Sequence, residues 1–215
     1  MSRLFLFIDM STVIAVTGGI ACGKSYCLDQ TVKRLSILEQ ESRVFSCDDA
    51  VSNLLTEEDI VGRLMERAGD QILEEGGAID RSKLRMLIFE DSKIRKKVEE
   101  VLHPAVFDLA VSFIKEFEGN SFSLIEVPLL YEVDFPIPRN FDLVIGCSEK
   151  TQLKRLQATR GIPHEQALQI LKSQLPIQQK VDQSQFVIWN DGSRESFDDQ
   201  LHRFLDFILS NTSGS

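Results

Sequence analysis

The sequence predicts a doubly wound α/β fold whose five-stranded sheet is mostly parallel, with an inserted helical region and a helical lid. Short apolar runs rich in β-branched and aromatic residues alternate with longer stretches of helical spacing, which is the pattern of a parallel sheet with helices on both faces. Two of the helical stretches are longer than simple crossovers need. A hydrophobic content of 43% over 215 residues is enough to fill the core of such a fold.

The first strand and the first helix flank a glycine-rich turn. Val13–Val16 is a short β-branched run, with a strand start expected at Thr12, and it ends in Thr17-Gly18-Gly19. Apolar residues then recur at helical spacing, so that strand, glycine loop and helix follow in that order. The helical positions are Leu28, Val32, Leu35 and Leu38.

Four further runs predict the remaining strands, and the helical segments between them predict parallel pairing. The carboxyl ends of such strands meet at one edge of the sheet, which is where ligands bind in open parallel sheets. The runs are Val44–Phe45, Phe122–Val127, Phe141–Gly146 and Phe186–Trp189.

The two long helical stretches are candidates for inserted subdomains over that edge. We expect Asp49–Phe117 to be broken at Gly69, at Gly76–Gly77 and at His103–Pro104. We expect Thr151–Val181 to be broken at Gly161–Pro163 and at Pro176. The predicted organisation is a core that holds the sheet, of residues 12–47, 105–150 and 182–209, with one inserted helical region of residues 48–104 and a second, the lid, of residues 151–181.

The composition favours a soluble cytoplasmic protein without nucleic-acid or membrane partners. The formal net charge is −9 and the pI is near 4.9, which argues against sequence-independent binding to anionic surfaces. The four cysteines show neither a disulfide framework nor zinc-ligand spacing. Met1–Met10 is too short and too interrupted for an export signal, and we expect either that it is an extension or that Met10 is the true start. We expect Ser210–Ser215 to be a disordered tail.

Gly18-Gly19-Ile20-Ala21-Cys22-Gly23-Lys24-Ser25 fits the phosphate-loop pattern, in the strand-to-helix context that the pattern requires. Its backbone N–H groups and the helix N-terminus suit the phosphates of ATP, Lys24 suits the β- and γ-phosphates, and the Ser25 hydroxyl suits Mg²⁺. The competing interpretation is a chance glycine turn before an ordinary helix. The nucleotide-binding residues predicted in and next to this loop are Gly18, Gly19, Ile20, Ala21, Cys22, Gly23, Lys24, Ser25 and Tyr26.

Cys22 lies inside this loop, where aimed N–H groups lower the pKa of a thiol. One hypothesis is a thiol that ATP shields from alkylation, and the alternative is a small packing residue.

Other parts of the chain narrow the class of phosphate-loop protein. A guanine-specific GTPase would carry an Asn-Lys-x-Asp loop, and an energy-coupling ATPase would end an apolar strand in an acidic pair. The sequence contains no Asn-Lys-x-Asp segment, and its third strand holds a single acid, Glu126, in place of an acidic pair. Small kinases remain, in which an inserted region grips the acceptor and an arginine-bearing lid closes on the donor.

Several segments together resemble the dephospho-coenzyme A kinase family, over about Thr12 to Leu209. The resemblance implies transfer of phosphate from ATP, with Mg²⁺, to the ribose 3′-hydroxyl of dephospho-coenzyme A, the last step of coenzyme A synthesis. Two alternatives are a kinase of a nucleoside monophosphate or sugar-like alcohol, and a nucleotide-dependent regulatory module. The segments are Val16–Ser25, Asp80–Arg85, Ile88–Phe89, Leu102–Pro104, Val127–Glu132, Thr151–Leu156 and Asn190–Ser193.

The resemblance also implies roles for individual residues. Asp48 would orient or deprotonate the acceptor hydroxyl, against the alternative of a helix N-cap, while Ser46 stands where the family usually has a second acid. Arg160 would close on the triphosphate as the lid arginine, against simple charge compensation at a helix end. For Arg155 two interpretations are open, a functional role and a position on a solvated helix face.

The remaining assignments concern the acceptor and the adenine. Arg81, with Lys83 and Arg85, forms a basic cluster suited to the acceptor's pyrophosphate, or else a solvated face. His103 is kept as a binding candidate, and Asn190 lies where the family places adenine, against a plain turn. Leu129 and Leu130 would make an apolar wall against the acceptor, with Glu132 as a cap or orienting group, and ordinary core is the alternative.

Overall fold

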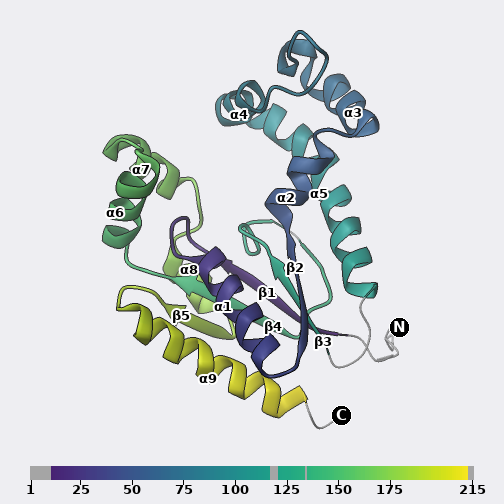
Figure 1. Ribbon diagram of the computed structural model, residues 1–215. Helices are drawn as coiled ribbons and strands as arrows, with labels where there is room; N and C mark the ends of the chain where they lie inside the picture. The colour runs from purple at the N-terminus through teal and green to yellow at the C-terminus, as the bar shows by residue number, and fades with distance from the viewer. Residues whose placement is uncertain (1–10, 117–120, 134, 213–215) are drawn as a thin grey trace. The chain divides into compact units, whose positions relative to one another are not determined.

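The computed structural model describes residues 11–116, 121–133 and 135–212, and its centre is a five-stranded sheet in the order β2-β3-β1-β4-β5 (Figure 1). Strand β1 pairs in parallel with β3 and β4, and β4 pairs in parallel with β5. The predicted α/β class with a mostly parallel sheet is therefore confirmed. The strands are β1 (Thr12–Gly18), β2 (Glu41–Ser46), β3 (Ser121–Glu126), β4 (Phe141–Gly146) and β5 (Phe186–Trp189).

Strand β1 is the middle strand because its side chains are apolar on both faces. Val13–Val16 are at most 2% exposed, as expected of a parallel strand covered from both sides. Val16 lies opposite Glu126 of β3 and opposite Leu143 of β4, so all three strands end at the same edge. The loop that follows β1 therefore begins at the carboxyl edge of the sheet.

The helices are interrupted at all of the predicted break positions except His103–Pro104. The predicted breaks at Gly69, Gly161–Pro163 and Pro176 are all present. The helices are α1 (Lys24–Ile37), α2 (Cys47–Leu54), α3 (Glu58–Ala68), the 3₁₀ helix η1 (Asp70–Ile72), α4 (Arg81–Glu90), α5 (Ser92–Lys115), α6 (Glu149–Arg160), α7 (His164–Lys172), α8 (Ile177–Gln183) and α9 (Arg194–Thr212).

The chain divides into two compact units, one of which contains the sheet. Residues Ser46–Ser112 form the helical unit, and the described residues before and after it form the sheet unit. In the sheet unit α1 and α9 lie side by side across the sheet (Figure 1). They bury one shared apolar cluster, to which Ile14, Leu35, Leu143, Phe197 and Leu205 belong.

The helical unit has its own small core, and it contains one departure from expectation. Ile60, Leu64 and Ile72 are at most 3% exposed. The predicted break at His103–Pro104 is wrong, because α5 runs through both residues. A proline inside a helix removes one hydrogen bond and costs about 3 kcal/mol, and burial of apolar side chains before and after it, such as Val101 and Val106, outweighs that cost.

The structure tests the prediction for the C-terminal end of the chain but not the one for the N-terminal end. The predicted disordered tail from Ser210 is wrong at its start, since α9 continues to Thr212. Its last turns are held by burial of Phe204 and Ile208 in the core. The expectation for Met1–Met10 lies outside the described residues. Among those that are described, no helix is long and apolar enough to cross a membrane.

Burial of Cys27 in α1 predicts a pH dependence of stability. Desolvation raises the pKa of this thiol from 9.0 to about 12, so the unfolded chain loses the proton at lower pH than the folded chain. The unfolded state then binds fewer protons between these values, and the free energy of unfolding falls as pH rises through that window. We expect this thiol to contribute a slope of up to about 1.4 kcal/mol per pH unit.

Urea unfolding of the unmodified chain and of Cys27→Ala, from neutral pH to about 10.5, measures this contribution. The variant starts from lower stability because of its cavity, but its stability should fall less steeply above pH 9.0. Equal slopes in the two proteins would contradict the prediction.

Candidate active site

The glycine-rich loop between β1 and α1 requires glycine at two positions. Gly23 has φ 102, a left-handed conformation that side chains strain, and a Cβ there would lie 2.5 Å from the Asn190 side-chain nitrogen. A Cβ at Gly18 would collide with the carbonyl group of Ile145 in the neighbouring strand β4. Ala21 also lies in the left-handed region, with φ 58. The loop is thus a tightly curled segment ending at the first residue of α1, Lys24.

Side chains from α6 and from the end of β5 hold three successive carbonyl groups of this loop. The Gln152 amide donates to Ile20 O at 2.8 Å. The Arg155 guanidinium donates to Ala21 O at 3.1 Å, and the Asn190 amide donates to Cys22 O at 2.7 Å. In a trans peptide the carbonyl and the N–H of the following residue point in opposite directions. The N–H groups of Ala21 and Gly23 are therefore turned away from these side chains, which is the arrangement that receives an anion.

Arg155 and Asn190 also bind each other. The Arg155 guanidinium donates to Asn190 O at 2.9 Å and to Asn190 Oδ1 at 3.3 Å. The solvated-face interpretation of Arg155 is therefore wrong, because its guanidinium is bound by Asn190 and by the loop carbonyl of Ala21, and the residue is only half-exposed. Asn190 is likewise more than a plain turn residue. Its amide nitrogen donates to the loop, and its amide oxygen accepts from Arg155, which itself binds the loop.

The residue after Asn190 holds the start of α6. Asp191 accepts hydrogen bonds from Ser148 N–H at 3.0 Å and from the Trp189 indole at 2.9 Å. Desolvation raises the pKa of the exposed Asp191 carboxylate, but the hydrogen bonds from Thr151, Ser148 and Trp189 outweigh it and lower the pKa overall. A charged carboxylate thus joins the end of β5 to the helix that carries Gln152 and Arg155.

The first turn of α1 presents a basic group and a hydroxyl group. The Lys24 ammonium lies 3.4 Å from Gly18 O and 3.3 Å from Gly19 O. Ser25 is exposed as the second residue of the helix. Tyr26 instead turns toward α9, where its hydroxyl donates to Asp198 at 3.0 Å and its ring packs edge-on against Phe197.

Cys22 is buried and pairs with a second thiol. Its sulfur accepts a hydrogen bond from the Cys147 thiol at 3.4 Å. This hydrogen bond lowers the pKa of Cys22, burial opposes it, and the charge of Lys24 lowers the pKa further. The pKa of Cys147 is raised by the same hydrogen bond and by burial. Both sulfurs are fully buried, so the lowered pKa belongs to a shielded thiol.

Asp48 occupies the first turn of α2, two residues after the end of β2. The helix begins at Cys47, and its N-cap is Ser46, whose hydroxyl accepts from Asp49 N–H at 3.2 Å. The capping interpretation of Asp48 is therefore wrong, and its exposed carboxylate is not used to start the helix. Ser46, which stands in place of an acid, has a structural role of its own.

The other acceptor candidates of the helical unit differ in their partners. Arg81 donates to Ser52 O at 2.6 Å and to its hydroxyl at 3.2 Å. Lys83 donates to Leu73 O at 2.8 Å, while Arg85 is exposed. The basic cluster is thus partly occupied in binding its own unit. His103 is half-buried within α5.

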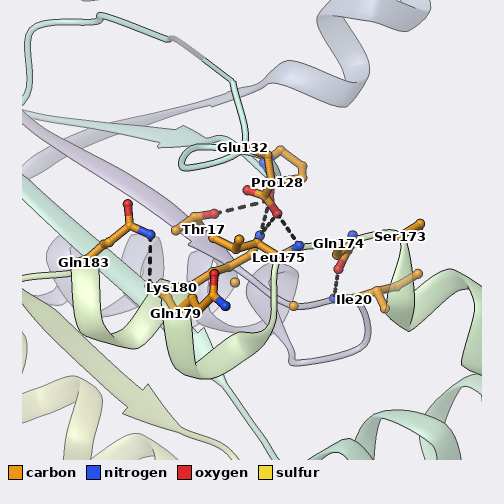
Figure 2. A network of polar contacts seen from close by, with 12 residues as sticks. Thr17, Ile20, Pro128, Glu132, Ser173, Gln174, Leu175, Gln179, Lys180 and Gln183 are labelled. Carbon is orange, nitrogen blue, oxygen red and sulfur yellow. Dashed lines mark hydrogen bonds and ion pairs between the residues drawn. The ribbon is translucent and has the colours of Figure 1, made fainter. Parts of the chain in front are cut away.

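The segment after β3 belongs to the sheet unit and separates into core and surface. Leu129 is 40% exposed, whereas Leu130 is 4% exposed. Only Leu129 is available as an apolar wall, and Leu130 packs inside. Glu132 accepts hydrogen bonds at one oxygen from buried Lys180 at 2.6 Å and from Leu175 N–H at 3.2 Å (Figure 2).

Sequence reasoning missed Lys180, Gln152 and Gln174 as site residues. Gln174 accepts from Ile20 N–H at 3.0 Å, and Lys180 is 0% exposed. The one available signal was the position of Lys180 on the same helical face as Ile177 and Val181. The two glutamines have no local signal, because their partners lie more than 100 residues away in the chain.

The lid candidate Arg160 is exposed at the last residue of α6. Gly161 follows with φ 63 and closes the helix in a left-handed turn before α7 begins at His164. A cavity of about 400 Å³ opens beside Gly19 and is lined by Gln152 and by apolar residues of α7 and its following segment, including Leu171 and Leu175. The sheet unit therefore offers room next to the loop on the side of the lid.

The side chains that could coordinate a metal ion near the loop suit an ion that binds together with a nucleotide. No group of three or more acidic, histidine or cysteine side chains able to hold a metal occurs in the part of the chain that the structure describes. Mg²⁺ typically takes one or two protein oxygens, phosphate oxygens and water. The exposed Ser25 hydroxyl at the helix start fits that pattern as a single protein ligand.

The fold and the loop together define the class of P-loop kinases. A shikimate kinase from Acinetobacter baumannii has the same fold, with a TM-score of 0.50 at 16% identity over 95% of this chain and 96% of that one. A dephospho-CoA kinase from Campylobacter jejuni has a TM-score of 0.55 at 24% identity, over 93% of this chain and 98% of that one. These likenesses show that the fold is shared.

Sequence comparison gives the family. The family model described as Dephospho-CoA kinase matches residues 12–196, so the chain belongs to the dephospho-CoA kinase family. A dephospho-CoA kinase of Lactobacillus acidophilus is 31% identical over 199 residues, 91% of this chain and 96% of that protein. A solved structure from Thermus thermophilus has a TM-score of 0.77 at 25% identity, over 95% of this chain and 100% of that chain. The family predicted from the sequence motifs is confirmed, and with it an ATP-dependent kinase.

The hydrogen bonds from Arg155 to the loop predict that removal of this side chain weakens the binding of ATP. Arg155→Ala removes the donor to Ala21 O and to Asn190, and charge-assisted hydrogen bonds of this kind contribute about 1.5 to 3 kcal/mol each. We expect affinity for ATP, measured by titration calorimetry, to fall about tenfold or more. Lys154→Ala is the matched control, since Lys154 is exposed on the same helix. ATP affinities that agree within a factor of two in the two variants would contradict this role.

Proposed function

We propose that this chain phosphorylates the ribose 3′-hydroxyl of dephospho-coenzyme A with ATP and Mg²⁺, giving coenzyme A and ADP, the last step of coenzyme A synthesis. The observation that carries the proposal is the phosphate loop with its three carbonyls held by Gln152, Arg155 and Asn190, in a chain that belongs to the dephospho-CoA kinase family. The held carbonyls keep the loop open toward an anion before any nucleotide arrives.

The two units suggest a division of labour between the substrates. We assign the nucleotide-binding core to residues 12–47, 105–150 and 182–209, and the acceptor region to residues 48–104. Residues 151–181 form the lid region in this proposal, and α8 is the part of it that packs on β4. Asn190 then acts near the adenine through its hold on the loop.

The donor side needs charge neutralisation and exclusion of water. We assign Lys24, at the start of α1, to the β- and γ-phosphates, and Ser25 would hold Mg²⁺. When bound, Mg²⁺ supplies charge compensation on the phosphates. Arg160, exposed beside the Gly161 turn, would swing onto the transferring group as the lid closes and would exclude water that hydrolyses ATP.

The acceptor side needs a carboxylate and a binding surface. Asp48 is exposed and unused by the helix cap, so it is available to orient the acceptor hydroxyl and accept its proton. Arg81 and His103 are assigned to the acceptor's phosphates and ribose, and Leu129, with Leu130 beneath it, to its apolar contacts. Ser46 caps α2 and is not assigned to the reaction.

The composition supports a cytoplasmic enzyme that acts on small molecules. A net charge of −9 disfavours nucleic acid as a partner. A loop thiol 3.4 Å from a second thiol suits a reducing compartment.

The assignment is tested by a coupled assay for ADP release with purified protein. ADP release should depend on dephospho-coenzyme A and on Mg²⁺, and nucleoside monophosphates or shikimate should not replace the acceptor. Phosphorus NMR of the product should show the new monoester on the ribose 3′-oxygen. Turnover with a nucleoside monophosphate and none with dephospho-coenzyme A would overturn the proposal.

Asp48→Asn separates acceptor activation from ATP binding. The substitution keeps the size of the side chain but removes the proton acceptor, so kcat should fall by about 10²- to 10⁴-fold with ATP affinity unchanged. Asp49→Asn is the matched control, because Asp49 is the adjacent exposed carboxylate in the same helical turn. Near-normal turnover of Asp48→Asn, or an equal loss in Asp49→Asn, would remove this role from Asp48.

A further inference from the structure

Lys180 is a charged residue in a fully buried position. Its side chain is 0% exposed, and its ammonium lies 2.6 Å from Glu132 Oε1. Burial of an ammonium group costs several kcal/mol, and well-packed apolar replacements of buried ion pairs are often at least as stable. The second oxygen of Glu132, Oε2, is buried and has no hydrogen-bond partner among the described residues. Stability alone therefore does not explain this pair.

The pair fixes both ends of the segment that follows β3. Lys180 donates to Pro128 O at 3.0 Å, and the buried Thr17 hydroxyl, one residue before the phosphate loop, donates to the same oxygen at 3.3 Å. Glu132, four residues later, binds the same ammonium (Figure 2). Leu129, the proposed acceptor wall, lies between these two attachment points, with buried Leu130 next to it.

The pair also reaches the segment that returns from the lid. Glu132 Oε1 accepts from Leu175 N–H at 3.2 Å, and the preceding residue, Gln174, accepts from Ile20 N–H of the phosphate loop at 3.0 Å. Figure 2 shows these contacts converging from different elements of the sheet unit. One ammonium thus sets the relative positions of the phosphate loop, the acceptor wall and the base of the lid.

We propose that Lys180 and Glu132 are positioning residues that hold the acceptor wall and the base of the lid against the phosphate loop. The inference rests on the proposed function, since it takes Leu129 to face the acceptor. Misplacement of a reacting group by about 1 Å can lower a rate about 10²-fold, so a rigid ionic contact behind the site is justified by geometry even where it adds no stability.

The experiment compares Lys180→Met, Glu132→Gln and the double variant. Each is measured for thermal unfolding, for ATP affinity, and for kcat and KM with dephospho-coenzyme A. Lys180→Met leaves the Glu132 carboxylate buried without its cation and should lower the unfolding temperature. The double variant replaces both charges and should recover much of that temperature. Both should show kcat/KM for dephospho-coenzyme A lowered by about 10- to 100-fold, with ATP affinity changed by less than about threefold.

Arg139→Met is the matched control. It removes another ion pair of the sheet unit, Arg139 with Asp142 at 2.5 Å, at the opposite end of β4 from the loop. This variant leaves the Asp142 carboxylate, whose side chain is 13% exposed, without its cation, so it should lower the unfolding temperature and leave kcat and KM within about twofold.

A double variant that regains the kcat/KM of the unmodified chain along with its unfolding temperature would overturn the inference, because the role would then be structural only. Lys180→Met with unchanged kinetics would overturn it as well. If Lys180→Met does not fold, the double variant alone decides between recovered and lowered kcat/KM. Absence of turnover with dephospho-coenzyme A in the unmodified chain would instead overturn the proposed function, and this inference with it.

Discussion

A phosphate loop must present its N–H groups to a ligand, and its carbonyl groups therefore need partners on the other side. Here Gln152, Arg155 and Asn190 supply one donor each to three successive carbonyls. An unpaired buried carbonyl costs about 1 to 3 kcal/mol, so these donors decide which way the loop faces. Because the donors come from α6 and from the end of β5, the loop is completed only when distant parts of the chain have folded.

This requirement explains several features that look unrelated in the sequence. Asp191 stays charged because it anchors the start of α6, and α6 in turn carries two of the three donors. Gly146, at the end of β4, admits the Trp189 ring, since a Cβ there would lie 2.8 Å from it. The end of β5 can then place Asn190 against the loop. Small residues and a carboxylate at the carboxyl edge of the sheet are thus part of the phosphate site without touching the phosphate.

The sequence predicted those parts of the site that depend on local pattern. Gly18 to Ser25 is readable because strand, glycine turn and helix are consecutive, and the strand runs are readable from their β-branched residues. Lys180 and Gln152 were not predicted, because their partners lie 52 and 132 residues away and neither residue type is distinctive. At Pro104 the local rule failed, since burial along α5 outweighed one lost hydrogen bond. At Asp48 the capping alternative failed by two residues, because Ser46 is the cap and α2 starts earlier, at Cys47.

Cys22 shows how the same packing requirement acts inside the loop. A Cβ at Gly19 would lie 2.9 Å from its sulfur, so the loop is packed closely around this side chain. The hydrogen bond from Cys147 and the charge of Lys24 favour the thiolate, yet the sulfur is fully buried. A reagent can reach it only if the loop opens, and the three carbonyl contacts oppose that opening. The limited space beneath the loop, whose carbonyl groups are held by Gln152, Arg155 and Asn190, therefore favours a small side chain at Cys22. The pKa of its thiol is lowered by two neighbouring groups of the phosphate site, Cys147 and Lys24.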